Sequence, residues 1–498
     1  MNVNPITRLD YPDLDVIRVE DTYYMVSTTM HFMPGCEILQ SFDLVHWEHV
    51  TYVYETLDHT DAQQLKSGQN IYGQGMWAAS LRYHEGRFYI CFVANDTRKT
   101  YLYTSEKIDG PWKKQLIEGF YHDGSLLFDE DGRNYIVYGN DEIWITELNE
   151  DLTAPKKDGL HRLLVSDHKN PKLGYEGSHI QKINGYYYIF LIHSLRDRWM
   201  RTEACFYSDS LEGEFTGGDV LCDDRGYCGQ GVAQGGIVDT PDGKWYAMLF
   251  QDSGAVGRIP ILLPVTWKDH FPVFGQNGHV PEEIEVHSTR PGYIYQPLVG
   301  SDDFCNGLLP RWQFNHDPDP RYYHLDALQG TYTITTREVC TELTQAVNTL
   351  TQRMSYPSCA AEVTVDASAL KEGDVAGLCA LQSCYAAVGI TKHHGKYEVL
   401  MLDKKEDGIL DMTEGTVVES HQMDFRLEAD FCNMKDEARC YYRVNKGDWL
   451  PIGTVHKLYF KLDHFTGCRF GLFCYAAEET GGSACFRDFK YYDVDEIS

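Results

Sequence analysis

Three carboxylates stand just ahead of strand-like stretches in the chain. They are Asp13 in "DYPDLDVI", Asp123 in "FYHDGSLLF" and Glu176 in "GYEGSHI". A single aspartate before a strand is more often a turn residue, but three such acids in similar surroundings favour a shared site. Cleavage of a glycosidic bond needs one acid that protonates the leaving oxygen and a second carboxylate that activates water or attacks the sugar. The three acids therefore predict acid–base chemistry on a sugar.

Two comparable segments carry no acid at this place. "GQGMWAASLRY" offers Trp77, whose ring could stack on a sugar, and "GVAQGGIVD" offers Gln234. Two further aspartates, Asp10 and Asp15, flank Asp13, and we interpret both as turn or hydrogen-bonding residues. The five segments together predict a funnel lined by acids, one Trp and one Gln.

The elements that would position these residues repeat five times. In each unit a turn residue precedes a tyrosine of a strand-like run by three positions, and the tyrosines are Tyr24, Tyr89, Tyr135, Tyr188 and Tyr246. Five such units predict a five-bladed β-propeller, in which the innermost strands of different blades begin around one funnel. A β-sandwich with frequent hairpins is the alternative.

The pattern changes after Phe274. A Gly- and Pro-rich stretch follows, and from about Ser301 the chain shows period-two strands such as "AAEVTVDA" and "RFGLFCYA" with almost no helical signal. We predict an all-β protein with a propeller over residues 1–298 and a β-sandwich over residues 299–498.

Composition limits the partners. The formal net charge of −30 disfavours nucleic acid and acidic membrane surfaces and suits neutral sugars. We expect no membrane span and no signal peptide, and therefore a cytoplasmic protein. The 15 cysteines contain no CxxC pair, so we expect reduced thiols and no zinc site.

The motifs resemble glycoside hydrolase family 43, specifically β-xylosidases and α-L-arabinofuranosidases with a C-terminal β-sandwich. The resemblance rests on "YPDLDVIRVEDTYY", "MWAASL", "DGSLLFDEDG", "EGSH" and "GRIPILLPVTW", and for the second region on "SDDF" and "GDVAGLCALQ". It implies a concanavalin A-like sandwich of jelly-roll type. It also implies that Asp13 is the general base of an inverting enzyme, that Glu176 is the general acid and that Asp123 orients Glu176 and tunes its pKa.

Further expectations follow from this resemblance. A neighbouring carboxylate should raise the pKa of Glu176 and keep it protonated near neutrality. Arg258 should hold substrate hydroxyls, and Met30 and Phe32 should line the sugar subsite. No cofactor is required. Gln234 stands where many members carry a His that binds calcium or an ordered water, so a calcium ion is an alternative without support from the sequence.

The sequence departs from the family pattern where proline is replaced by Leu14, Gly124 and Ser178. The leading hypothesis is an exo-acting inverting glycosidase that releases arabinofuranosyl or xylosyl ends from hemicellulose-derived oligosaccharides. The alternative is a non-catalytic carbohydrate-binding propeller. The sialidase and fructosidase propeller motifs are absent. A homo-oligomer and a scaffolding role for the sandwich stay open.

Overall fold

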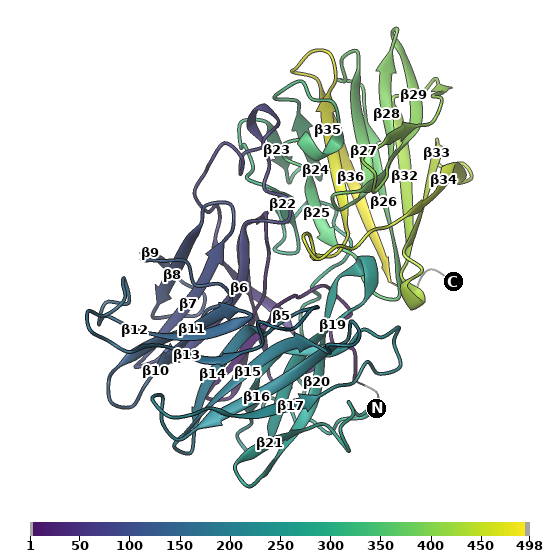
Figure 1. The fold of residues 1–498 in the computed structure, drawn as a ribbon. Helices are drawn as coiled ribbons and strands as arrows, with labels where there is room; N and C mark the ends of the chain where they lie inside the picture. Colours follow the sequence, from purple (N-terminus) through teal and green to yellow (C-terminus); the bar gives the residue numbers. More distant parts are fainter. Residues whose placement is uncertain (1–2, 494–498) are drawn as a thin grey trace.

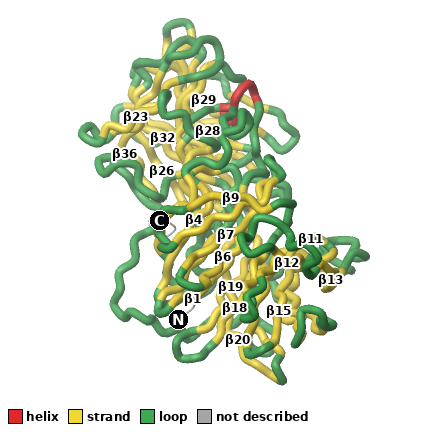
Figure 2. The backbone as a smooth tube through the Cα atoms, turned by 90° about the vertical axis from the view of Figure 1, so that its left-hand side faces the viewer, coloured by secondary structure: helices red, strands yellow, loops and turns green. Residues whose placement is uncertain are grey.

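The computed structural model describes residues 3–493, and it is built almost entirely of strands (Figure 1). Helical structure in this part is confined to four short 3₁₀ turns, η1 (Lys66–Gly68), η2 (Gly254–Val256), η3 (Leu343–Gln345) and η4 (Cys432–Met434). Residues 3–493 contain no helix with the length and apolar character that crossing a bilayer requires. The strands form two bodies stacked along the long axis of the molecule (Figure 2).

The N-terminal body contains five four-stranded antiparallel sheets, each formed by strands that follow one another in the chain. Blade one holds β1 (Asp15–Val19), β2 (Thr22–Val26), β4 (Gly35–Ser41) and β5 (Glu48–Tyr54). Blade two holds β6 (Met76–His84), β7 (Arg87–Ala94), β8 (Lys99–Ser105) and β9 (Lys113–Ile117). Blade three holds β10 (Ser125–Phe128), β11 (Asn134–Asn140), β12 (Glu142–Leu148) and β13 (His161–Ser166). Blade four holds β14 (Glu176–Ile183), β15 (Tyr186–Ser194), β16 (Arg201–Ser208) and β17 (Thr216–Leu221), and blade five holds β18 (Val232–Asp239), β19 (Trp245–Asp252), β20 (Arg258–Lys268) and β21 (Phe271–Phe274).

The five tyrosines of the repeat lie on the second strands of the blades, β2, β7, β11, β15 and β19. In four blades the preceding hairpin contains a glycine with φ between 78° and 84°, as at Gly86 and Gly185, a backbone conformation that glycine adopts without steric cost. The first strands β1, β6, β10, β14 and β18 contact one another in this order, and β18 contacts β1. The predicted five-bladed propeller is therefore confirmed.

The N-terminal segment closes the ring. The side chain of Asn4 hydrogen-bonds both the N–H and the carbonyl of Leu262 in β20. Further along, the N–H of Tyr11 donates to the carbonyl of Arg258. These bonds occupy the edge of β20 that β21 leaves unpaired, so the first and last blades are joined before β1 begins.

Two antiparallel sheets form the C-terminal body and confirm the predicted sandwich. One sheet has the order β22 (Gln313–Asn315), β25 (Leu350–Arg353), β35 (Arg469–Ala476), β27 (Asp374–Leu381), β28 (Tyr385–His393), β29 (Lys396–Lys404) and β30 (Leu410–Met412), with β31 (Thr416–Val418) also paired to β29. The other has the order β23 (Tyr323–Asp326), β24 (Thr331–Thr335), β36 (Ser483–Asp493), β26 (Ser358–Asp366), β32 (Gln422–Asp430), β33 (Glu437–Val444) and β34 (Leu450–Lys457). Apolar side chains from both sheets form one buried core between them.

The two bodies are joined by more than the connecting chain. Strand β3 (Phe32–Met33), which lies between two strands of blade one in the sequence, pairs with β22 and extends the first sheet of the sandwich. Arg353 of the sandwich reaches Glu37 of blade one in a buried ion pair of 2.8 Å. The connection after β21 packs on blade one through Thr289 and Tyr295, which bond the backbone of Phe42. These contacts fix the sandwich over one end of the propeller.

Candidate active site

The three predicted acids lie at the beginning of inner strands of the propeller, on the end that faces the sandwich. Asp13 precedes β1, Asp123 precedes β10 and Glu176 is the first residue of β14. Asp13 and Asp123 adopt left-handed backbone angles, with φ of 50° and 49°. In blade four Gly177 takes this conformation, with φ of 66°. Glu176 is therefore offset by one residue from the other two acids, whereas the sequence suggested the same place in all three blades.

A cavity of about 220 Å³ brings the acids together. Of the predicted residues, the structure places six around it: Asp13, Trp77, Asp123, Glu176, Gln234 and Arg258. The other lining residues are His122, Asn140, Leu173, Trp199, Arg201, Leu462 and Phe465. Leu462 and Phe465 come from the sandwich, so the second body completes the wall of the cavity.

Asp13 is held by two donors. The Arg258 guanidinium donates to Oδ1 over 2.6 Å, and the Thr28 hydroxyl donates to Oδ2, also over 2.6 Å. Arg258 is itself buried, bonded to Asp252, and stacked under the ring of Phe465 at 3.8 Å. Arg258 thus compensates the charge of Asp13 and fixes its orientation. The resemblance implied that Arg258 holds substrate hydroxyls, and only its Nη2 is left for that role, because Nε bonds Asp252 and Nη1 bonds Asp13.

The two flanking aspartates are structural, as interpreted from the sequence. Asp10 accepts hydrogen bonds from the backbone N–H groups of Arg258 and Gly467 and so ties the propeller to a sandwich loop. Asp15 accepts from Arg82 over 2.7 Å and lies 3.2 Å from Nδ1 of His179. Burial opposes ionisation of Asp15, but Arg82 and His179 outweigh it and hold its pKa at about 2. Neither side chain lines the cavity.

His122 connects the two acids on the far side of the cavity. Its Nε2 lies 3.5 Å from Asp123 Oδ2 and 3.8 Å from Glu176 Oε2. The Asp123 carboxylate, followed by Glu176, raises the pKa of His122 to about 9 in spite of partial burial. Near neutral pH the ring is therefore an imidazolium between two carboxylates.

The pKa values of the two acids differ from expectation. Burial raises the pKa of Asp123 to about 6, against the opposing effect of His122. Burial would also raise the pKa of Glu176, but the charge of the neighbouring His122 outweighs it and holds the pKa of Glu176 below the ordinary value of 4.5. The expectation that a neighbouring carboxylate keeps Glu176 protonated is thus wrong for the unliganded site, because the His122 imidazolium beside it favours the ionised carboxylate. In the cluster of His122, Asp123 and Glu176, protons therefore reside on His122 and, below about pH 6, also on Asp123.

Sequence reasoning missed several residues of the site. Asn140 at the end of β11 donates to Glu176 Oε2 over 2.8 Å. Arg201, the first residue of β16, is buried and pairs with Asp252, while its Nε and Nη1 have no partner within residues 3–493. Only His122 carried a local signal, its place beside Asp123. The others lie on second and third strands, in loops of blade four or in the sandwich, where the inner-strand pattern cannot find them.

Met30 and Phe32 do not line the cavity, which corrects their predicted role. Both are almost completely buried between the two bodies. The Met30 sulfur lies 3.4 Å from the hydroxyl of Thr466, and the Phe32 ring lies under the guanidinium of Arg469 at 3.5 Å. Phe32 belongs to β3, whose pairing with the sandwich draws this segment away from the funnel.

Gln234 lies on the cavity wall, but its surroundings do not suit calcium. Its N–H donates to the buried carboxyl of Glu203, whose pKa burial raises well above the ordinary value. Calcium takes about six to eight oxygen ligands, whereas the same wall presents the guanidinium groups of Arg201 and Arg258. Ligand atoms of His122, Asp123 and Glu176 also lie within 4.8 Å of one another, yet a cation there would displace the proton that acid catalysis requires. The residues therefore fit a metal poorly at both places.

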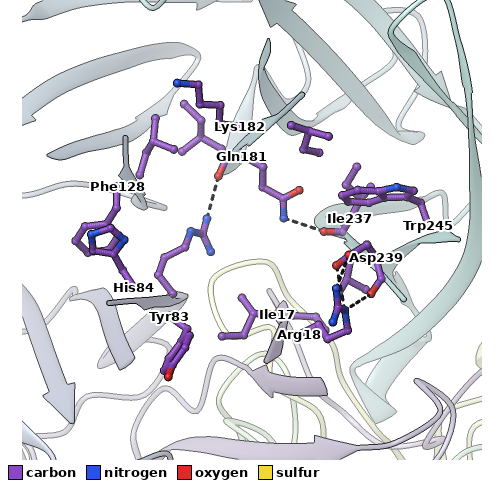
Figure 3. A pocket seen from close by; sticks show the side chains of 16 residues that line it. Ile17, Arg18, Tyr83, His84, Phe128, Gln181, Lys182, Ile237, Asp239 and Trp245 are labelled. Carbon is purple, nitrogen blue, oxygen red and sulfur yellow. Dashed lines mark hydrogen bonds and ion pairs between the residues drawn. The ribbon is translucent and has the colours of Figure 1, made fainter. Parts of the chain in front are cut away.

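A larger cavity of about 410 Å³ occupies the opposite end of the inner strands (Figure 3). Its charged residues are already engaged: Arg18 pairs with Asp239 at 2.5 Å, and Lys182 pairs with Asp129 at 2.6 Å. Its size exceeds that of the acid-lined cavity, but it contains no close group of acids that could exchange a proton with a ligand. The chemistry therefore belongs to the end where Asp13 and Glu176 meet.

Two family models match the chain, one over each of its two bodies. The model of glycosyl hydrolases family 43 matches residues 3–272, and the model of the β-xylosidase C-terminal concanavalin A-like domain matches residues 301–492. A β-xylosidase of Formosa agariphila is 26% identical over 99% of this chain and 89% of its own length. A non-reducing end α-L-arabinofuranosidase of Bacteroides ovatus is 24% identical over 82% of this chain and 79% of its own. The solved structure of a bifunctional GH43-CE protein of Bacteroides eggerthii is 42% identical over 99% of this chain with a TM-score of 0.92, and the present chain spans 64% of that one.

Proposed function

Because the chain belongs to family 43 of the glycosyl hydrolases, we propose that it is an exo-acting, inverting glycosidase that removes terminal arabinofuranosyl or xylosyl residues from hemicellulose-derived oligosaccharides. The observation that carries the proposal is the meeting of Asp13 and Glu176 in one cavity from blades that are not neighbours. At about 220 Å³ the cavity is smaller than the roughly 300–1,000 Å³ typical of drug-sized ligands. It suits one terminal sugar residue.

The mechanism divides the work between two carboxylates. Asp13, oriented by Arg258 and Thr28, removes a proton from a water molecule that attacks the anomeric carbon. Glu176 delivers a proton to the glycosidic oxygen as the bond to the leaving sugar breaks. An inverting enzyme keeps the two groups about 6.5–9.5 Å apart so that this water fits between them. Asp13 of blade one and Glu176 of blade four are separated by blade five on one side of the ring, which supports a gap that can hold this water.

The proton of Glu176 has a nearby source. His122 and Asp123 flank this carboxylate and hold the proton of the unliganded site. We infer that a sugar oxygen placed against Glu176, in a cavity from which it expels water, draws this proton onto Glu176. Asp123 also accepts the N–H of Gly177 over 3.0 Å, which fixes the start of β14. Asp123 then orients Glu176 through two of its neighbours, the His122 ring and the backbone N–H of Gly177.

The remaining lining residues would recognise the sugar. Trp77 offers a ring face, and the Phe465 ring closes the cavity edge-on to it at 5.0 Å between centroids. The unpaired nitrogens of Arg201 and the amide of Gln234 would bond ring hydroxyls. The names of the two relatives, a β-xylosidase and an α-L-arabinofuranosidase, support pentose sugars.

Hydrolysis of aryl α-L-arabinofuranoside and aryl β-D-xyloside tests the proposal, with NMR detection of the anomer released first. Asp13→Asn and Glu176→Gln should each lower kcat by roughly 10²–10⁴-fold, whereas Glu150→Gln on the exposed rim of blade three should not. Release of the retained anomer would refute the inverting mechanism. Binding of pentose oligosaccharides without any turnover would favour the alternative, a carbohydrate-binding propeller.

We also propose that the enzyme acts in the cytoplasm. All 15 cysteines lie in the described part of the chain and are free, and 11 of them are buried or half-buried. Reduced thiols in this number suit a reducing compartment. Cell fractionation with detection of the protein in the soluble cytoplasmic fraction tests this proposal.

A further inference from the structure

A second cavity of about 660 Å³ adjoins the active site on the side of blade two. The propeller contributes Trp77, Asn95 and Arg98, and the sandwich contributes loops that follow β29 and β34. The cavity is three times as large as the one that holds the acids. It can therefore hold a larger group than a single terminal sugar.

The two cavities share a wall. Trp77 lines both of them. In the sandwich loop over residues 459–465, Leu462 and Phe465 face the active site, while Lys461 and His464 face the second cavity. Trp77 also lies beside His122, with 6.3 Å between ring centroids. The second cavity thus opens on the side where the general acid meets the leaving group.

Polar atoms without internal partners gather at this wall. They are Trp77 Nε1, Asn95 Nδ2, Tyr459 Oη and His464 Nδ1, each buried and each without a hydrogen-bond partner within residues 3–493. Buried polar groups of folded proteins are paired in the great majority of cases. These four groups would gain partners from a ligand rich in hydroxyl groups, such as further sugar rings, bound in this cavity.

The charge of the cavity is opposite to that of the protein. In a chain with a net charge of −30, the lining contains four cations, Arg98, Lys404, Lys405 and Lys461, and two acids. The lysines are engaged by carboxylates: Lys404 pairs with Glu342 at 2.6 Å, Lys405 with Asp411, and Lys461 with Glu406 at 3.6 Å.

Arg98 differs from these lysines. It is exposed, lies over the ring of Phe120 at 3.8 Å, and forms no ion pair within residues 3–493. A guanidinium fixed by an aromatic ring and free of an acid is suited to a carboxylate on a ligand.

We propose that the second cavity binds the leaving-group side of the substrate and that Arg98 receives the carboxylate of a uronic acid carried by that sugar chain. This inference rests on the proposed function, because it takes the acid-lined cavity as the place of the terminal pentose. The preferred substrates are then acidic pentose oligosaccharides, in which the uronic acid is attached close to the bond that is cut.

Calorimetric binding of two matched pentose oligosaccharides, one neutral and one carrying a uronic acid, tests the inference in the Glu176→Gln background. The acidic ligand should bind more tightly, and Arg98→Gln should reduce its affinity roughly 10- to 100-fold, the range expected for a lost charge-assisted hydrogen bond. The affinity of the neutral ligand should change much less. Arg87→Gln removes an arginine from the other end of blade two and should leave both affinities unchanged.

Equal affinities for the two ligands, or an equal loss for both in Arg98→Gln, would overturn the inference. Binding is measured without turnover, so the outcome does not depend on hydrolysis. Failure of the wild-type protein to hydrolyse aryl pentosides would refute the proposed function instead. The preference for the acidic ligand should also shrink as salt is raised from about 0.05 to 0.5 M, because salt screens the attraction of exposed charges.

Discussion

Replacement of His122 by Gln should change the pH dependence of catalysis more than its maximum rate. Gln keeps a hydrogen-bonding side chain of similar length but cannot carry charge. In the wild-type site His122 faces carboxylates from three blades, Asp123, Glu176 and Asp13. On the opposite side, the cations Arg201 and Arg258 also act on Glu176. The substitution therefore removes the group that holds the last proton of this cluster.

The size of the effect follows from the pKa of His122. Its rise from 6.5 to about 9 corresponds to about 3 kcal/mol of net stabilisation of the imidazolium, which remains after burial has opposed the attraction of the facing carboxylates. In the wild-type enzyme kcat/KM should fall on the alkaline side with a pKa near 9, where the cluster loses this proton. In His122→Gln the last proton is held by Asp123 and Glu176, and the pKa of Asp123 is about 6 with the imidazolium present. Loss of the imidazolium raises the pKa of both acids, so we expect the alkaline limb at about 6 to 7.

The assay is kcat/KM for an aryl pentoside between pH 4.5 and 10. At pH 8 the variant should be roughly 10- to 100-fold less active than the wild type, and near pH 5 the two should be similar. Asn140→Ala is the matched control, because it removes a neutral hydrogen bond to Glu176. It should lower the rate evenly across the pH range. An alkaline limb that stays near 9 in His122→Gln would refute the reasoning, since Glu176 would then hold its proton independently of His122.

Three further predictions concern metal, the sandwich loop and acid stability. Dialysis against EDTA should leave kcat unchanged, and a loss that calcium restores would contradict the poor fit of a metal to this site. Phe465→Ala should lower kcat/KM roughly 2- to 30-fold through loss of the contact with Arg258, a range typical of cation–π pairs; wild-type kinetics would show that the sandwich only covers the cavity. Burial lowers the pKa of His316 to about 3 and that of His464 to about 4. Between these values and the ordinary pKa of 6.5, both side chains are neutral in the folded protein and protonated in the unfolded chain. The free energy of unfolding should therefore fall as pH drops from 6.5 towards 4, by about 1.4 kcal/mol per pH unit for each His. His316→Gln should weaken the decline of Tm between pH 7 and pH 5, and an unchanged decline would count against this assignment.

The sequence could predict the parts of this molecule that depend on local chemistry. A turn residue, glycine in four of the five units, followed three positions later by a strand tyrosine specifies a hairpin within a few residues, so five such signals predict five blades. An acid at the start of an inner strand is also a local feature, and Asp13, Asp123 and Glu176 do meet in one cavity. The one-residue offset of Glu176 escaped notice because it depends on which residue of each bulged strand adopts the left-handed conformation.

Features that depend on distant contacts could not be predicted in this way. The two residues of β3 look like part of the funnel in the sequence, yet their partner is β22 in the other body, and this pairing removes Phe32 from the site. The prediction of a raised pKa for Glu176 was wrong for the same reason. The sequence shows a carboxylate and an imidazole side by side, Asp123 and His122, one blade before Glu176. Only the packing of blade three against blade four decides that the imidazolium sets the pKa of Glu176. The positions of strand ends are thus fixed by local sequence. The protonation of a site at those ends is fixed by the order of the blades and the docking of the sandwich. The charge state of such a site therefore has to be derived from the assembled structure.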